Sequence, residues 1–176
     1  MRLGILGPLL VVGDNGGEIR VAAPRQRTLM AALLVHANRT VPIDELVQIV
    51  WDSEPPMGAA RTVRSYMTRL RLVVGSRVAS RILTRETGYL CQVHEDELDA
   101  LRFEALCREG SAALQDRAWR RASDSLARAL ALWRGSPLAD IAAPILHREC
   151  AHRLEPARLR ALEQRAEADF HLSLRD

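Results

Sequence analysis

Lysine is absent from this chain of 176 residues, and all 25 of its basic residues are arginine. Cysteine is scarce: Cys91, Cys107 and Cys150 lie far apart, and no two of them have the CxxC spacing of a zinc ribbon. Neither a disulfide framework nor a structural zinc site is therefore indicated. This cysteine usage is typical of a protein in the reducing cytosol.

Long apolar segments are also missing. The chain opens with the apolar stretch MRLGILGPLLVVG, but Pro8 interrupts it and no cleavage site of a signal peptide follows. No run approaches the roughly 18 apolar residues that a membrane-spanning helix needs. We therefore expect a soluble, cytoplasmic, nucleoid-associated protein that has no membrane partner.

The usual signs of an enzyme are lacking as well. The sequence has no glycine-rich phosphate loop, and its Ser, His, Asp and Cys residues form no evident catalytic set. His147, Cys150 and His152 suggest a metal site, but their spacing does not place all three on one face of a helix. We expect no catalytic residue, no cofactor and no bound metal.

Acidic residues are missing from one basic stretch. From Pro55 to Arg85 the sequence carries seven arginines and no Asp or Glu. Residues 1–93 hold 12 arginines against 7 acidic residues, whereas residues 94–176 hold 13 against 15. The basic first half indicates a polyanionic partner for that half alone.

The centre of the acid-free stretch is the segment RTVRSYMTRLR, residues 61–71. Apolar residues recur along it at spacings of four, three and four, namely Val63, Met67, Leu70 and Val74. This periodicity predicts a helix with one buried stripe and a basic opposite face, which fits the major groove of DNA. An ordinary solvated amphipathic helix has the same pattern, so the helix alone does not decide between the two.

The order of the predicted elements favours DNA binding. We expect short strands within residues 2–21, a helix from Pro24 to about Asn38, a bridging residue at Val41, a short helix from Pro42 to about Trp51, a loop over 52–58, the basic helix over 59–74 ended by Gly75, and strands near 82–83 and 89–90. Helix–turn–helix followed by a hairpin is a winged helix, whose third helix enters the major groove. Residues 1–94 are therefore predicted to be a winged helix-turn-helix with a small N-terminal β-sheet.

Residues 95–176 differ in composition from the first half. They are rich in Ala, Leu, Arg and Glu, and their apolar residues recur with helical periodicity. Three helices are predicted, over about 98–114, 119–133 and 145–172, as tetratricopeptide-like hairpins. The fold class is thus α+β followed by all-α. Pro156 predicts a kink or break near residues 154–156. A repeat array needs about three repeats, so this half is expected to be incomplete as an array.

An ordered series of segments runs through nearly the whole chain. It comprises LGILGPL, PRQRTLMAALLVHANRTV, DELVQIVWDSEPP, RTVRSYMTRLR and TGYL in the first half, and DALRFEALCREG, ARALALWRGSPLADI and LRALEQRAEAD in the second. This series resembles the Streptomyces antibiotic regulatory protein (SARP) family of transcription activators. The resemblance implies an OmpR-type winged helix over 1–94 and a bacterial transcriptional activation domain over 95–176.

The resemblance also implies a function. Members bind double-stranded DNA at tandem direct repeats beside a promoter, commonly as two protomers, and recruit RNA polymerase holoenzyme through a sigma factor or another subunit. Control of a secondary-metabolite gene cluster is the expected role. One departure is that the family's helical domain normally continues well beyond the length present in this sequence.

Site residues carry over from the matching segments. The resemblance implies that the DNA-binding residues are Arg61, Thr62, Arg64, Ser65, Tyr66, Thr68 and Arg69 of the basic helix, and Arg85 and Thr87 of the wing. Arg64 and Arg69 are the best candidates for contact with base edges, with phosphate contact as the alternative. Arg61 is expected to bind phosphate, and Tyr66 either lies at the core edge or bonds a phosphate. Glu86 departs from the pattern, because an acid at the wing tip repels phosphate.

Further arginines flank this set. Arg25 and Arg27 begin the first helix, where phosphate contact and a solvated position are both open. Arg71, Arg77 and Arg81 are expected at the periphery of the interface.

An alternative function is a protein-interaction adaptor, in which the helical half is the working surface and the winged helix is a scaffold. An adaptor does not require the basic face of residues 55–85. In either case the loop over 52–58 is a candidate contact for the transcription machinery.

Overall fold

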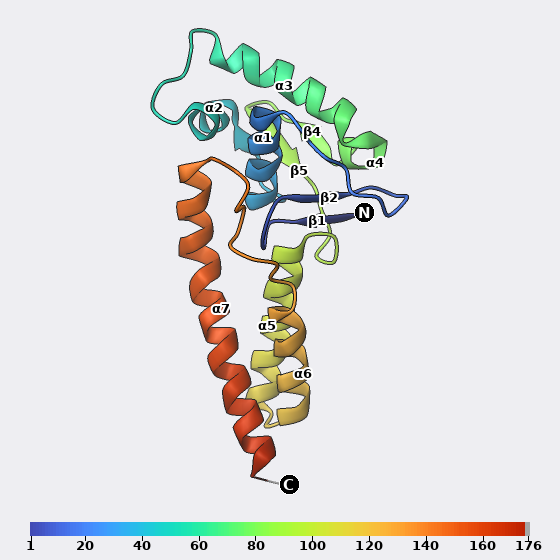
Figure 1. The fold of residues 1–176 in the computed structure, drawn as a ribbon, viewed down its shortest axis with the longest axis vertical. Coiled ribbons are helices and arrows are strands. Elements are labelled where there is room, and N and C mark those ends of the chain that lie inside the picture. The colour runs from blue at the N-terminus through green and yellow to red at the C-terminus, as the bar shows by residue number, and fades with distance from the viewer. Residues whose placement is uncertain (175–176) are drawn as a thin grey trace.

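Figure 1 shows a winged helix at one end of the molecule and a helical half that extends away from it. The computed structural model describes residues 1–174, and within them no helix combines the length and apolar character needed to cross a bilayer. All strands precede residue 92, and the second half is helical. The predicted fold class is therefore confirmed as α+β followed by all-α.

The chain begins with a small sheet. It contains β1 (Arg2–Gly4) and β2 (Leu10–Val12), which pair antiparallel. Beyond them, Val12 forms a single bridge with Glu18, and Gly16 in the turn between them has a φ of 74°, which glycine adopts without strain. Leu3 of β1 also bridges to Leu98, so this sheet connects the two halves of the chain.

Three helices then form the helical part of the winged helix. They are α1 (Pro24–Val35), α2 (Ile43–Trp51) and α3 (Ala59–Val73). Pro24 occupies the first turn of α1, as predicted. Gly75, with a φ of 79°, follows the end of α3 and begins α4 (Gly75–Ala79). The sequence did not indicate α4, because five residues are too short to show a helical period.

The wing is a three-stranded antiparallel sheet. Its order is β3 (Val41–Pro42), β5 (Gly88–Cys91) and β4 (Ile82–Thr84). The predicted bridge at Val41 is confirmed by its pairing with Tyr89. A Cβ atom on Gly88 would lie 1.9 Å from the carbonyl oxygen of Val41. Glycine is therefore required before Tyr89 so that β3 can approach β5 closely.

The second half is a helical hairpin and one long helix. Its elements are α5 (Asp99–Gln115), α6 (Trp119–Leu130) and α7 (Pro144–Ser173), with α7 packed along the α5–α6 pair (Figure 1). A Cβ on Gly110 would lie 2.5 Å from Cγ of Leu126, so α5 and α6 pack closely there. Trp133 follows α6 and packs edge-to-face on Phe103 at 5.4 Å between ring centroids.

The sequence predicted a kink or a break in the third helix near residues 154–156. The break is not found, because α7 continues from Pro144 to Ser173 with Pro156 inside it; the kink stays a prediction. Pro156 is exposed, whereas Leu154 and Ala161 are buried on another face. The carbonyl that loses its intrahelical partner belongs to His152, which is also exposed. Water can bind that carbonyl, so the helix continues past the proline.

Polar contacts join the two halves beside β1. The Asp99 carboxylate, at the start of α5, accepts hydrogen bonds from the N–H groups of Ile5 at 2.8 Å and Leu6 at 3.1 Å. Arg134 pairs with Asp99 at 3.1 Å and donates to the carbonyl of Pro8 at 2.8 Å. Burial raises the pKa of the Asp99 carboxyl, and these hydrogen bonds partly offset that rise.

A second group of contacts joins the halves through Asp140, which precedes α7, and Arg153 of α7. Asp140 accepts a hydrogen bond from the N–H of Leu9 at 2.8 Å and forms an ion pair with Arg27. Arg153 of α7 donates to the carbonyl of Val35 at 3.0 Å. A single hydrophobic core also continues from the winged helix into α5, α6 and α7. The domain boundary between residues 94 and 95 stays a prediction.

Candidate nucleic-acid interface

α3 lies across the end of the molecule that is farthest from the C-terminal helix end (Figure 1). Its inner stripe is fully buried and consists of Val63, Met67, Leu70 and Val74. Its outer stripe is exposed and repeats the same spacing with Arg61, Ser65, Thr68 and Leu72. The predicted amphipathic helix is therefore confirmed, and its polar face is open to a partner.

One flank of α3 faces the wing. Arg71 donates to the carbonyl of Ile82 at 2.8 Å and to the hydroxyl of Thr84 at 2.9 Å. Its guanidinium also lies 5.5 Å from the ring centroid of Tyr89. Arg64, two turns earlier on the same flank, is exposed. Arg71 thus fastens α3 to the wing sheet, while Arg64 remains available.

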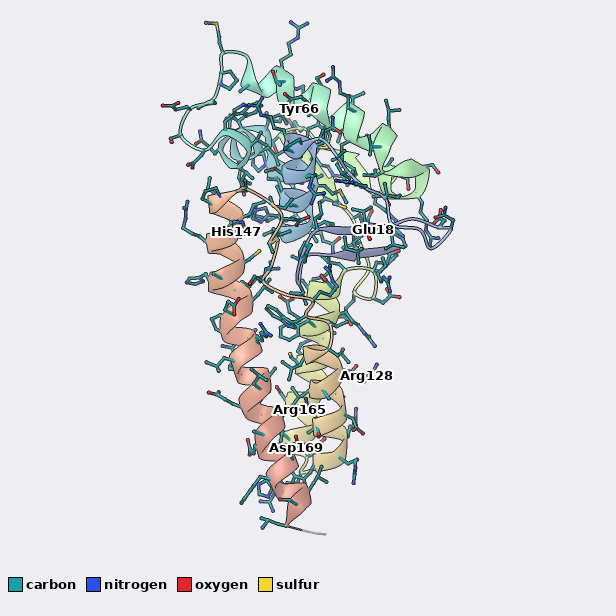
Figure 2. The ribbon with its side chains drawn as sticks, in the orientation of Figure 1. Glu18, Tyr66, Arg128, His147, Arg165 and Asp169 are labelled. Carbon is teal, nitrogen blue, oxygen red and sulfur yellow. The ribbon has the colours of Figure 1, made fainter. Side chains whose placement is uncertain are left out.

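The other flank of α3 faces α1 and α2. Tyr66 projects from this flank (Figure 2) and stacks on Trp51 of α2, with ring centroids 6.3 Å apart. Arg25 of α1 donates to the Tyr66 hydroxyl at 3.3 Å and lies over the Trp51 ring at 5.1 Å from its centroid. Thr62 and Arg69 lie one turn to either side of Tyr66 on this flank. Sequence reasoning missed the cluster, because nothing in the spacing links Arg25 with Trp51.

The wing tip carries the two predicted contact residues. Arg85, Glu86 and Thr87 are all exposed. The N–H of Arg85 donates to the carbonyl of Gly88 at 2.8 Å and closes the hairpin. The carbonyl of Thr87 accepts from the N–H of Ile43 at 3.0 Å, which ties the tip to the start of α2. The acid at position 86 therefore stands beside Arg85 and Thr87 on the same exposed tip.

The arginines of the acid-free stretch differ in their partners. Arg77 pairs with Asp14 at 2.8 Å, and Arg81 pairs with Glu97 at 3.1 Å. Within residues 1–174, four arginine side chains of the stretch form neither an ion pair nor a hydrogen bond: Arg61, Arg64, Arg69 and Arg85. These four are all predicted DNA contacts.

A polar cluster that the sequence did not suggest lies between α1, α2 and α7. The Nε2 atom of His36 lies 3.0 Å from Glu149 and 3.5 Å from Glu45. Arg39 approaches Nδ1 of His36 at 2.8 Å. Because a guanidinium only donates, Nδ1 is the acceptor and Nε2 carries the proton that faces Glu149. Burial lowers the pKa of His36, against the opposing effect of Glu149.

His147 and Cys150 are two of the three residues that suggested a metal site in the sequence, and the structure shows their surroundings. Nε2 of His147 lies 2.6 Å from the carbonyl oxygen of Ile141, and Cys150 is buried. All three cysteines are free thiols. Burial raises the pKa of Cys91 to about 12 and those of Cys107 and Cys150 to about 11. They are therefore protonated at neutral pH and weakly nucleophilic.

Two family models match the chain. The model "Transcriptional regulatory protein, C terminal" matches residues 17–91, and "Bacterial transcriptional activator domain" matches residues 98–175. Among curated relatives, regulatory protein AfsR of Streptomyces coelicolor is 35% identical over 97% of this chain and 17% of its own length. Regulatory protein DnrI of Streptomyces peucetius is 31% identical over 98% of this chain and 66% of its own.

A solved structure has the same fold. It is Mycobacterium tuberculosis EmbR in complex with a low-affinity phosphopeptide, with a TM-score of 0.91 and 30% identity. The match covers 98% of this chain and 46% of the EmbR chain. This chain therefore spans less than half of EmbR, as it spans only 17% of AfsR.

The winged helix and the two matched models define the class, which is a winged-helix domain of the transcriptional regulatory type followed by a bacterial transcriptional activator domain. The chain belongs to the Streptomyces antibiotic regulatory protein family.

Proposed function

We propose that this chain is a sequence-specific DNA-binding transcription activator. The observation that carries the proposal is the outer face of α3, where Arg61, Arg64 and Arg69 are exposed and have no acidic partner within residues 1–174. A helix of this shape and charge fits the major groove, and unpaired guanidinium groups bind guanine edges or phosphates.

The positions of the side chains along α3 support different DNA contacts for different residues. Ser65 and Thr68 are small and lie on the outermost line of the helix, so the backbone of α3 can approach the base edges. Arg64, on the wing flank, is the proposed reader of a guanine. Arg61, in the first turn, is the proposed phosphate contact.

The remaining predicted residues lie on either side of the α3 face that enters the major groove. Thr62 and Tyr66 lie on the flank toward α1 and α2, where a hydroxyl can bond a phosphate. Arg85 and Thr87 of the wing contact the backbone or the minor groove in this proposal. Glu86 weakens the wing contact by repelling phosphate, so α3 contributes most of the affinity.

Activation requires a second surface. We propose that two protomers bind adjacent direct repeats and recruit RNA polymerase holoenzyme, through a sigma factor or another subunit. The relatives AfsR and DnrI are regulatory proteins of Streptomyces, which supports control of a secondary-metabolite gene cluster. The loop of residues 52–58 between α2 and α3 is exposed throughout and is the proposed contact.

The experiment compares a direct-repeat promoter fragment with random DNA of equal length over a series of salt concentrations. We expect tighter binding to the promoter fragment and a linear fall of log K with log salt, because phosphate contacts release counterions. Equal affinity for both DNAs, or an affinity that does not change with salt, would contradict the proposal.

An adaptor function remains the second candidate because of one observation on α7. Leu159, Leu162 and Phe170 are 58%, 48% and 59% exposed, an unusual amount of apolar surface for one helix. A protein partner could bind there in either function. The DNA measurement separates the two, because an adaptor needs no sequence-specific affinity for DNA.

A further inference from the structure

The start of α7 lies beside α1 and α2 of the winged helix (Figure 1). One side chain from each of these three segments meets there, namely His36 directly after α1, Glu45 of α2 and Glu149 of α7. The atoms that they offer, Nε2 of the imidazole and one oxygen of each carboxylate, all lie within 4.8 Å of one another. An imidazole with two carboxylates is a donor set that divalent transition metals bind.

The distances around Nε2 of His36 fit ligands that share one ion. Nε2 lies 3.0 Å from a carboxylate oxygen of Glu149 and 3.5 Å from one of Glu45. Zinc holds imidazole nitrogen and carboxylate oxygen at about 2.0 to 2.2 Å, so two such ligands at an angle of about 90 to 110° lie about 2.8 to 3.6 Å apart. Both distances fall within this range.

Nε2 of His36 is an independent sign of a ligand. The imidazole side chain is only 10% exposed, so it is nine-tenths buried. Although an oxygen of Glu149 lies 3.0 Å away, it is poorly aligned with the N–H, and Nε2 has no hydrogen-bond partner within residues 1–174. A buried ring nitrogen without a partner is costly, and an ion between the imidazole and the carboxylates would satisfy it.

The charges around this position favour a cation. The C-terminal end of a helix carries partial negative charge, and His36 directly follows α1. Of two arginines nearby, Arg153 is engaged by the carbonyl of Val35 at 3.0 Å. Arg39 contacts Nδ1 of His36 at 2.8 Å and Glu45 at 3.1 Å, and its side chain is 59% exposed. Arg39 is therefore the competing cation, and it is free to turn into solvent.

We propose that His36, Glu45 and Glu149 bind one divalent transition-metal ion such as Zn²⁺, with water completing its coordination. Nε2 gives up its proton to solvent and ligates the ion, Nδ1 takes up a proton, and Arg39 turns away. Because the ligands come from both halves of the chain, the bound ion fastens the winged helix to α7. No metal was expected from the sequence, since no spacing links three ligands so far apart.

Zinc binding to the untagged full chain tests the site, by titration calorimetry and by melting temperature. We expect one ion per chain and a higher melting temperature in zinc than in chelator, because an ion that binds only the folded state stabilises it. His36→Gln and Glu149→Gln are each expected to weaken zinc binding by about a hundredfold. The Glu149 side chain is 38% exposed, so its variant tests the site even if His36→Gln does not fold.

Arg39→Gln is the sharper variant, because it removes the competing cation and keeps all three ligands. We expect it to bind zinc about tenfold more tightly than wild type. A cluster that serves only as an ion-pair network would lose stability in this variant and gain no zinc affinity.

Two controls accompany these variants. Glu95→Gln removes an acid from a distant ion pair, with Arg108 at 2.7 Å, and His152→Gln removes an exposed histidine of the HxxCxH string. We expect both to bind zinc as wild type does.

The outcomes separate this inference from the proposed function. Wild type without saturable zinc binding, or zinc binding that survives both His36→Gln and Glu149→Gln, would overturn the site. Zinc binding that is lost in His152→Gln would place the ion at the HxxCxH string and overturn it as well. None of these measurements involves DNA, so a chain that binds zinc as expected but shows no sequence-specific DNA affinity would overturn the proposed function alone.

Discussion

Arg71, Arg77 and Arg81 are engaged within the fold, whereas Arg64 and Arg85 are free within the described residues. The sequence makes all of them look alike, because each is an arginine in the same acid-free stretch. Their difference is physical: a free guanidinium can bind a phosphate or a guanine directly, but a paired one must first lose its partner.

Replacing Arg64 tests base recognition. Arg64→Ala is expected to lower the preference for promoter over random DNA by about 1–3 kcal/mol, the contribution of one bidentate arginine–guanine contact. Competition binding against random DNA measures this preference directly. Arg77→Ala serves as the control and should leave the preference unchanged. An equal loss on both DNAs would make Arg64 a phosphate contact.

At the scale of elements, the helices with clear apolar periodicity were predictable and the features without it were not. The buried stripe of α3 follows from the spacing of Val63, Met67 and Leu70. α4 was not predicted, because five residues are too few to show a helical period. The break considered at Pro156 is not found, because Pro156 lies on a solvated helix face, and the tertiary structure decides which face is solvated.

The continuous α7 makes a prediction about Pro156. Pro156→Ala restores the hydrogen bond to the carbonyl of His152 and is expected to stabilise the fold by about 1–3 kcal/mol. Thermal or urea unfolding measures the change. Leu159→Ala, on the same exposed side, is the control and should change stability little. A destabilised Pro156→Ala variant would argue that the proline is needed for the shape of α7.

The proposed role of the loop between α2 and α3 leads to a prediction about transcription activation. Met57 is fully exposed there. Met57→Ala is expected to leave DNA affinity unchanged and to lower promoter-dependent transcription by about fivefold or more, the effect of losing one apolar anchor to a polymerase subunit. Transcription with purified polymerase measures this, with Ser53→Ala as the control in the same loop. A parallel loss of DNA binding would remove the loop from the activation surface.

At the scale of the whole molecule, the winged helix and the helical half share one core and a set of buried polar contacts. The position of α3 relative to α7 is therefore set by packing and not by a loose linker. A partner bound on the helical half is then held at a defined position relative to DNA.

The hydrogen bonds and the ion pair of Asp99, which join the two halves, lead to a prediction about the stability of the fold. Asp99→Ala leaves the N–H groups of Ile5 and Leu6 and the guanidinium of Arg134 without their acceptor. We expect a loss of about 2–4 kcal/mol in the free energy of unfolding, measured with urea. Asp96→Ala, at an exposed position, is the control. A loss no greater than that of the control would mean that the junction contributes little to stability.

The His36 cluster makes a prediction about pH. Burial lowers the pKa of His36 in the folded state below its ordinary value of about 6.5. The unfolded state therefore binds more protons in this window, so stability falls as the pH decreases from about 6.5 to the folded pKa. His36→Gln should lose this part of the pH dependence, while His94→Gln, at an exposed position, should keep it. Identical profiles in all three proteins would exclude His36 as the cause.

The sequence by itself determined the element order, the amphipathic α3 and the segregation of positive charge, because periodicity, turn residues and charge are local properties. It also determined the family resemblance, which the matched models confirm. Which arginines are free was decided only by the tertiary structure, since their partners, such as Asp14 for Arg77 and Glu97 for Arg81, are distant in sequence or on other elements. The same holds for the cluster of Arg25, Trp51 and Tyr66, which meet only because α1, α2 and α3 pack against one another.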